Sequence, residues 1–224
     1  MIMKTNFRHL SSRFFFIALF LFSFASCKKK EEEIVRIQSV IPQDIIDNLQ
    51  SRGMAINSGS KPPKLDFAIE ATPYELLEPY GSDDNYYKGE VIADYRYKFY
   101  GQTEKQEITY DYYNNGADKG AGQGAFIIGA GNKFTIFSED IGKLSGISYK
   151  TATIISGEIS GNTIKNFQYA FVLKEKDGDE RNVTMMPVNK SRIWIDGDFI
   201  SESISNFRLS GKENVKTGSM LSAQ

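Results

Sequence analysis

Cysteine and histidine are almost missing from this chain of 224 residues, which holds one of each, Cys27 and His9. A single cysteine excludes any disulfide bond within the chain. Because both residues lie within the first 27 positions, the remainder has neither an imidazole nor a thiol. This excludes Ser-His-Asp and Cys-His catalysis there, and it leaves no His or Cys ligand for zinc. An enzyme built on the remainder would have to use carboxylates, lysine, tyrosine or serine.

The chain also lacks an apolar run long enough to span a bilayer as a helix. Its longest apolar stretch, Phe14 to Phe24, covers only 11 residues, whereas a membrane-spanning helix needs roughly 20. Basic residues precede this stretch and two small residues follow it, which is the three-part pattern of an export signal. We therefore expect residues 1–26 to be a signal peptide that is removed.

Cys27 directly follows the small residues Ala25 and Ser26, in the sequence Leu-Phe-Ser-Phe-Ala-Ser-Cys. This resembles the lipobox of bacterial lipoproteins, although Phe24 stands where that pattern more often has an aliphatic residue. The resemblance implies cleavage before Cys27 and acyl chains, such as palmitate, attached at that cysteine. The alternative is a free thiol after an ordinary signal, which would be exposed to oxidation outside the cytoplasm.

Three lysines and three glutamates follow the cysteine, at positions 28–33. Such a charge block buries no apolar surface and is typical of a solvated tether. It also resembles the surface-export signal of lipoproteins from the Bacteroidota, and the two interpretations are compatible. We expect residues 27–33 to hold the chain in the cell envelope, lipid-anchored at the outer membrane, with exposure on the cell surface left open.

The charge balance argues against a nucleic-acid partner. Removal of residues 1–26 leaves 24 lysines and arginines against 28 aspartates and glutamates, a net charge of −4. Nucleic-acid binding requires a basic excess or a clustered basic stripe, and neither is evident. The expected partners are therefore the membrane, through the lipid anchor, and a ligand or envelope protein that the sequence does not identify.

Residues 34–64 form the expected lead-in to a single domain. Residues 34–40 alternate loosely and predict a strand or extended segment. Ile41 to Arg52 has apolar residues at helical spacing, with Pro42 at the first turn and Gly53 as the stop, and predicts one short amphipathic helix. Asn57 to Lys64, with a glycine and two prolines, predicts a loop.

Residues 65–210 are expected to be β-rich and residues 211–224 to be a polar tail. Val91 to Phe99 alternates apolar and polar residues, and Ile108 to Tyr112 does the same after Gly101, which predicts a hairpin. A short strand is expected at Leu65 to Ala71, and Pro73 to Asn85 is expected to be irregular. The further expected strands are Ala125 to Ile128, Lys133 to Ser138, Ile147 to Ile159, Thr163 to Lys174, Asn182 to Pro187 and Arg192 to Asp196, with Phe199 and Ile200 ending the sheet.

These strands alternate with turn residues and have no helices between them, which predicts an all-β fold. The expected architecture is an antiparallel meander, preceded by one short N-terminal helix. It is closed as a barrel or folded as a sandwich, and a closure that resembles lipocalins is favoured. The glycines from Gly116 to Gly131 are expected to form a loop between strands, because no helix or Gly-Lys-Ser/Thr follows to bind phosphate.

Two further motifs have plain structural interpretations. Ser58 to Lys61 and Lys216 to Gly218 match two signatures of serine β-lactamases, but Pro62 and Pro63 prevent the helix on which the serine must lie. The Asp-Gly-Asp sequences at 177–179 and 196–198 suggest calcium, but neither continues into a calcium-binding loop, and Asp-Gly favours a hairpin turn. We expect no catalytic residues, no metal and no cofactor.

Tyrosine is abundant, with 12 residues that all follow Cys27. Most should pack in the sheet core. A minority near expected strand ends are candidates for ligand binding: Tyr86, Tyr87, Tyr112, Tyr113 and Trp194. The favoured function is a lipid-anchored domain that binds a ligand or protein without catalysis. The alternatives are a carboxylate-dependent glycan hydrolase and an assembly subunit of an outer-membrane complex. The chain resembles small envelope lipoproteins of the Bacteroidota over residues 27–33.

Overall fold

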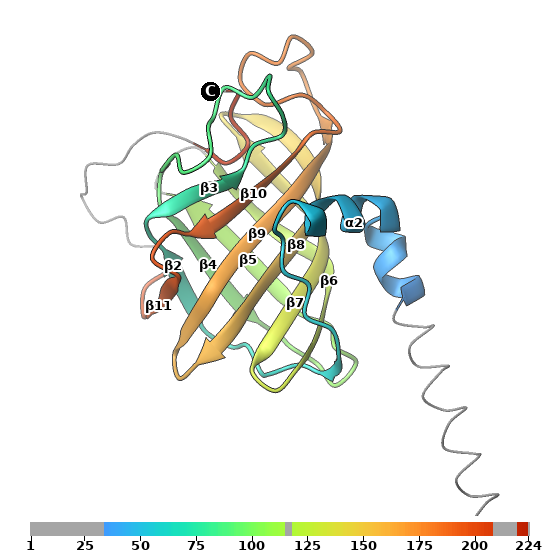
Figure 1. Cartoon of the computed structure of the whole chain (residues 1–224), viewed down its shortest axis with the longest axis vertical. Coiled ribbons are helices and arrows are strands. Elements are labelled where there is room, and N and C mark those ends of the chain that lie inside the picture. Colours follow the sequence, from blue (N-terminus) through green and yellow to red (C-terminus); the bar gives the residue numbers. More distant parts are fainter. Residues whose placement is uncertain (1–33, 115–117, 208–218, 224) are drawn as a thin grey trace, which may run out of the picture. The chain divides into compact units, whose positions relative to one another are not determined.

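A computed structural model describes residues 34–114, 118–207 and 219–223 of the chain (Figure 1). Its contacts divide the chain into two compact units, residues 1–42 and 43–224. In the first unit, residues 34–40 are helical, which corrects the extended segment predicted there. Ile34, Ile37 and Ile41 also fit a helical period, and a run this short fits both periods. Within the described residues, no helix has the length and the apolar character needed to cross a membrane.

The predicted amphipathic helix is confirmed as α2, Gln43–Ser51, which buries Ile46 and Leu49. It ends as the sequence predicts, because Gly53 adopts a φ of 104°. The N–H of Met54 donates to the carbonyl of Leu49 at 3.0 Å, and the N–H of Gly53 donates to the carbonyl of Gln50 at 3.1 Å. These two bonds form a Schellman motif, which satisfies the last carbonyls of the helix.

The rest of the second unit is a sheet of 11 strands among the described residues. The strands are β1 Ser60–Lys61, β2 Ala68–Ala71, β3 Tyr74–Glu78, β4 Tyr95–Tyr100, β5 Thr109–Asn114, β6 Asp118–Ala130, β7 Lys133–Leu144, β8 Ile147–Ser160, β9 Thr163–Lys176, β10 Ser191–Asp196 and β11 Ile200–Ile204. The all-β prediction, with a short helix ahead of the sheet, is confirmed.

The sheet closes on itself as an antiparallel ring of strands. From β2 the ring runs through β4, β5, β6, β7, β8 and β9, and β11 pairs with both β9 and β2. Strands β10 and β3 continue from the second half of β9, and β1 pairs with β6 in parallel. The long strands β6 to β9 supply most of the wall in Figure 1. Closure leaves the ring strands with few unpaired edges.

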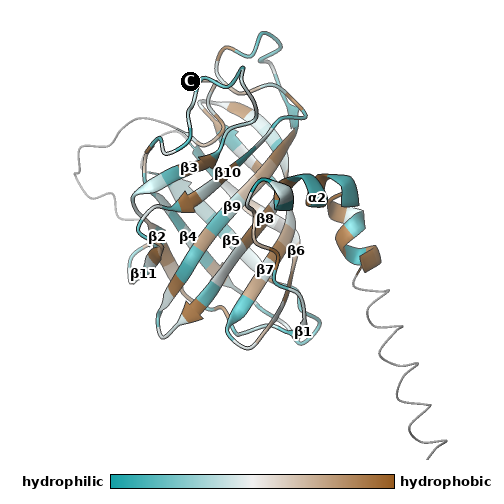
Figure 2. Cartoon of the chain, viewed as in Figure 1, coloured by the Kyte–Doolittle hydropathy of each residue, from teal (hydrophilic) through white to brown (hydrophobic). Residues whose placement is uncertain are grey.

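Aromatic side chains fill the inside of the ring. The predicted hairpin is confirmed as β4 and β5, with Tyr97 opposite Tyr112 and Phe99 opposite Tyr110. All four side chains are buried, and their polar neighbours in sequence face outward. The ring of Tyr97 also lies 5.6 Å from that of Tyr169 on β9. Figure 2 shows hydrophobic and hydrophilic residues following one another along strands β7 to β9, as expected for strands with one buried face.

Of the glycine-rich stretch predicted as a loop, residues 118–130 form strand β6. Within β6, a Cβ atom on Gly120 would lie 2.3 Å from the hydroxyl of Tyr112. One on Gly122 would lie 2.2 Å from the ring of Tyr110. The missing side chains therefore make room for two tyrosine rings from the neighbouring strand, and packing of those rings overrides the low strand propensity of glycine.

Three smaller predictions were wrong. Residues 182–187 do not return as a strand, because Asp179 accepts the N–H groups of Val183 and Met185 and holds them in a loop. Residues 74–78, expected to be irregular, form β3. At the chain end, Met220 and Leu221 are buried rather than part of a polar tail. Residues 211–218 of that tail, the Lys216–Gly218 motif, the signal peptide and Cys27 lie outside the described residues.

Candidate functional site

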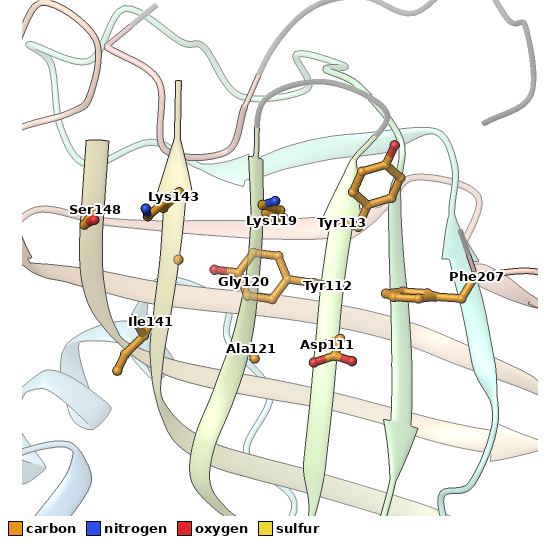
Figure 3. A pocket seen from close by; sticks show the side chains of 11 residues that line it. Asp111, Tyr112, Tyr113, Lys119, Gly120, Ala121, Ile141, Lys143, Ser148 and Phe207 are labelled. Carbon is orange, nitrogen blue, oxygen red and sulfur yellow. The ribbon is translucent and has the colours of Figure 1, made fainter. Parts of the chain in front are cut away.

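A pocket of about 620 Å³ lies on the outer face of strands β5 to β8 (Figure 3). Its size is in the range of ligand-binding pockets. It is lined by the outward-facing residues Asp111, Tyr113, Lys119, Ala121, Ile141, Lys143 and Ser148, and by Phe207, which follows β11.

Strand register brings these side chains together. Tyr113 lies opposite Lys119, Lys119 opposite Lys143, and Lys143 opposite Ser148, so four adjacent strands contribute to one row. Figure 3 shows this row, with the ring of Tyr113 beside Lys119. The ring of Phe207 lies on the side of Asp111 that is away from Lys119. Because alternate residues of a strand share a face, all members of the row point out of the ring.

The floor of the pocket is thin because two glycines face each other there. Gly120 on β6 pairs with Gly142 on β7. On the inner side of the sheet the rings of Tyr112 and Tyr149 occupy the space that their side chains would fill, and the two hydroxyls meet at 2.6 Å. Residues 120 and 142 face the interior, so the outer side at these positions is backbone, flanked by the two lysines and by the apolar side chain of Ile141.

The lysine pair gives the pocket its electrostatic character. Lys119 and Lys143 are exposed and directly opposite each other on neighbouring strands, an arrangement that is unfavourable for like charges. Among the described residues, neither forms an ion pair. The lining has one carboxylate, Asp111, so the pocket carries a net positive charge within a chain of negative net charge.

Two other carboxylates are sealed inside the ring. Asp118 accepts hydrogen bonds from the hydroxyls of Tyr95, Tyr149 and Ser219. Asp140 accepts them from Tyr110, Ser138 and Tyr169. Burial raises the pKa of both aspartates, and the hydroxyl donors oppose that shift. Both side chains are fully buried, so a substrate in solution has no access to them.

Asp196 lies at the turn between β10 and β11. Its Oδ2 accepts a hydrogen bond from Ser201 at 2.6 Å, and its Oδ1 is buried with no partner among the described residues. Burial, together with the nearby carboxylate of Asp198, raises the pKa of Asp196 to about 7. In residues 34–114, 118–207 and 219–223, no three His, Cys, Asp or Glu side chains come together as a metal site.

The predicted aromatic residues separate into two pairs and one single residue. Tyr112 and Tyr113 both line the pocket, the first from beneath Gly120 and the second from the rim. Tyr86 and Trp194 are buried together elsewhere, with ring centroids 6.1 Å apart, and the guanidinium of Arg192 lies 4.7 Å from the Tyr86 ring. Tyr87 stands alone with 68% of its surface exposed.

The sequence reasoning missed the charged members of the site, which are Asp111, Lys119 and Lys143, and also Phe207. Lys119 was hidden because the glycines around it predicted a loop. The structure does not support the β-lactamase interpretation of Ser58 to Lys61, because Ser58 lies outside any helix. Comparison with protein-family models, with curated proteins and with solved structures finds no match to the chain.

Proposed function

We propose that this chain is a non-catalytic binding protein, anchored by lipid at Cys27 in the outer membrane, that holds a small polar ligand in the pocket on β5 to β8. The observation that carries the proposal is the pocket itself. A volume of about 620 Å³ brings together two lysines, a carboxylate, a serine and three aromatic rings. Convergent polar groups around a concave surface are the usual features of a ligand site.

The lining favours a polar ligand with a ring over an apolar one. Charged side chains reach the pocket from three strands, so a fatty or purely apolar molecule would leave them without water and unpaired. The rings of Tyr113 and Phe207 offer flat surfaces on which a sugar or another ring can stack. The ring interior offers less space, because buried tyrosines and phenylalanines fill it.

The carboxylates support binding over glycan hydrolysis. A glycoside hydrolase places two carboxyl groups about 5 to 9 Å apart on either side of the scissile bond. Three of the pockets lined by described residues each carry one carboxylate in their lining, from Asp111, Asp66 and Glu158 respectively. The buried pair Asp118 and Asp140 is enclosed by tyrosine hydroxyls, which suits a structural role.

The proposed location, anchored by lipid in the outer membrane, rests on the first 33 residues of the sequence. With Cys27 acylated, several chains would hold the protein in the bilayer, since each buried CH₂ contributes about 0.8 kcal/mol. The charged block at 28–33 would keep the domain away from the headgroups. We expect the Cys27→Ser variant to lose labelling by radioactive palmitate and to keep its signal peptide. Labelling equal to that of the wild type would refute the anchor.

A pocket-filling variant tests the binding site. Ala121 lines the pocket between Asp111 and Ile141 and points outward, so Ala121→Trp fills space in the pocket without entering the core. We expect the full-length protein in nonionic micelles to bind members of an oligosaccharide array, and Ala121→Trp to lose that binding while its thermal unfolding is unchanged. An array with no bound saccharide, or one bound equally by Ala121→Trp, would contradict the proposal.

A further inference from the structure

We infer that the ligand of this pocket is an acidic saccharide, with its carboxylate or sulfate held between Lys119 and Lys143. The inference deepens the proposed binding function and rests on it. It starts from the lysine pair, whose two ammonium groups extend from directly opposed residues of neighbouring strands.

Opposed like charges are an unfavourable feature that strands normally avoid. Side chains at such positions have Cβ atoms about 4.5–5.5 Å apart, so both ammonium groups can contact a single anion. Neither lysine has an ion-pair partner among the described residues, and the one carboxylate in the lining, Asp111, forms no ion pair with either of them. A bound carboxylate or sulfate would turn repulsion between the lysines into attraction toward a shared partner.

The other lining groups suit the sugar that carries the acid. Asp111 repels an anion but accepts hydrogen bonds from hydroxyl groups, and Ser148 both donates and accepts them. Tyr113 and Phe207 add rings for stacking, and Figure 3 shows both of them on the β5 side of Lys119. The acid group therefore lies over β6 and β7, and the hydroxyl-bearing parts of the saccharide extend toward Asp111 on β5 and toward Ser148 on β8.

The charges also set how binding responds to salt. Both lysines are exposed, so their attraction for an anion is screened over about 10 Å at 0.1 M ionic strength. Affinity for an acidic saccharide should fall as salt is raised. Affinity for a neutral saccharide of the same shape should stay nearly constant.

Isothermal titration calorimetry of the full-length protein in nonionic micelles tests the inference with three probes. These are trigalacturonate, its neutral methyl ester and sodium acetate. The test variant is Lys119→Gln/Lys143→Gln. The matched control is Lys165→Gln/Lys174→Gln, which removes the same charge from exposed positions on β9 outside the three pockets described above.

We expect trigalacturonate to bind at least tenfold more tightly than its ester or acetate, and the test variant to lose that tenfold preference while the control keeps it. Two results would overturn the inference: equal affinity for trigalacturonate and its ester, or a test variant that binds like the wild type. If Ala121→Trp still abolishes binding in either case, the proposed binding function stands. If acetate binds as tightly as trigalacturonate, the site recognises the anion alone, and the assignment of a saccharide ligand is wrong. If no saccharide binds, or if Ala121→Trp binds like the wild type, the proposed function falls as well.

Discussion

Asp84 and Arg192 form a bidentate ion pair although 108 residues separate them in the chain. Arg192 Nη2 lies 2.6 Å from Asp84 Oδ1, Nε lies 2.9 Å from Oδ2, and both side chains are fully shielded from solvent. Nη1 of the same arginine donates to the carbonyls of Met220 and Ser222. One guanidinium thus joins β10, the segment after β3 and the last described residues.

Replacing this arginine should destabilise the domain. Arg192→Met leaves the carboxylate of Asp84 buried without its partner, and breaking such a pair costs about 3–5 kcal/mol of unfolding free energy. Urea denaturation measures the loss, and hydrogen exchange should rise at residues 220–222. The double variant Arg192→Met/Asp84→Leu should recover part of the stability, because it removes the unpaired charge but does not restore the donor to Met220 and Ser222. If the double variant is as unstable as the single one, the buried charge is not the cause.

The glycines of β6 give a second prediction. Gly120→Ala places a methyl group where the Tyr112 ring lies, and overpacking of this kind lowers the unfolding free energy by about 1–3 kcal/mol. In a Tyr112→Ala background the same change should be nearly neutral, because the space is then open. A double-mutant cycle by chemical denaturation measures this coupling. Additive effects would mean that the ring and the glycine do not compete for one space.

This packing explains which parts of the fold the sequence could predict. The β4–β5 hairpin could be predicted from its alternating apolar and polar residues, because one face is buried and the other is exposed to solvent. Ala125 to Ile128 in strand β6 was predicted, but the first part of the strand was missed because glycine indicates a turn unless the tyrosines across the sheet are already placed. Strand β3 was missed because Pro73 and Pro79 flank it, and its pairing with β10 joins segments far apart in the chain.

The candidate site depends on register even more strongly. Tyr112 and Tyr113 were found because they stand near a predicted strand end. Lys119 and Lys143 become neighbours only when β6 and β7 are paired at Gly120 and Gly142, and a one-residue slip of either strand would turn its lysine toward the core. The sequence alone could not set that register, so a charged pair of this kind could be found only in the folded chain.

Asp179 should stabilise its loop in a pH-dependent way. Burial would raise its pKa, but hydrogen bonds from the Met185 N–H and from Lys176 lower that pKa to about 2. A lowered pKa in the folded state stabilises the protein above about pH 4, and the contribution disappears as the pH falls through about 2.

The Asp179→Asn variant should therefore be less stable than the wild type at pH 7, by about 2–4 kcal/mol for a carboxylate with several charged hydrogen bonds. The gap should narrow as the pH falls from 4 toward 2. Asp177→Asn, at an exposed position beside the same loop, is the matched control and should change little. A gap that stays constant across this range would argue against an ionised Asp179.

Asp196 should act in the opposite direction. Its folded-state pKa of about 7 exceeds the unfolded value of about 3.9. Between these values the folded chain holds a proton that the unfolded chain releases, so this residue makes stability fall as the pH rises from 4 to 7. Asp196→Asn should be more stable than the wild type at pH 8 and similar to it at pH 4. Denaturation curves at both pH values decide, and a difference of equal size at each would refute the raised pKa.

The most direct test of the binding site is a map of the residues that a bound ligand contacts. Two-dimensional NMR of the full-length protein in nonionic micelles, titrated with trigalacturonate, should show shifts concentrated at Asp111, Lys119, Lys143 and the Ile141 methyl groups. Residues inside the ring, such as Tyr97 and Tyr169, should not move. Shifts confined to the interior, or spread evenly over the surface, would contradict a ligand site on the outer face of β5 to β8.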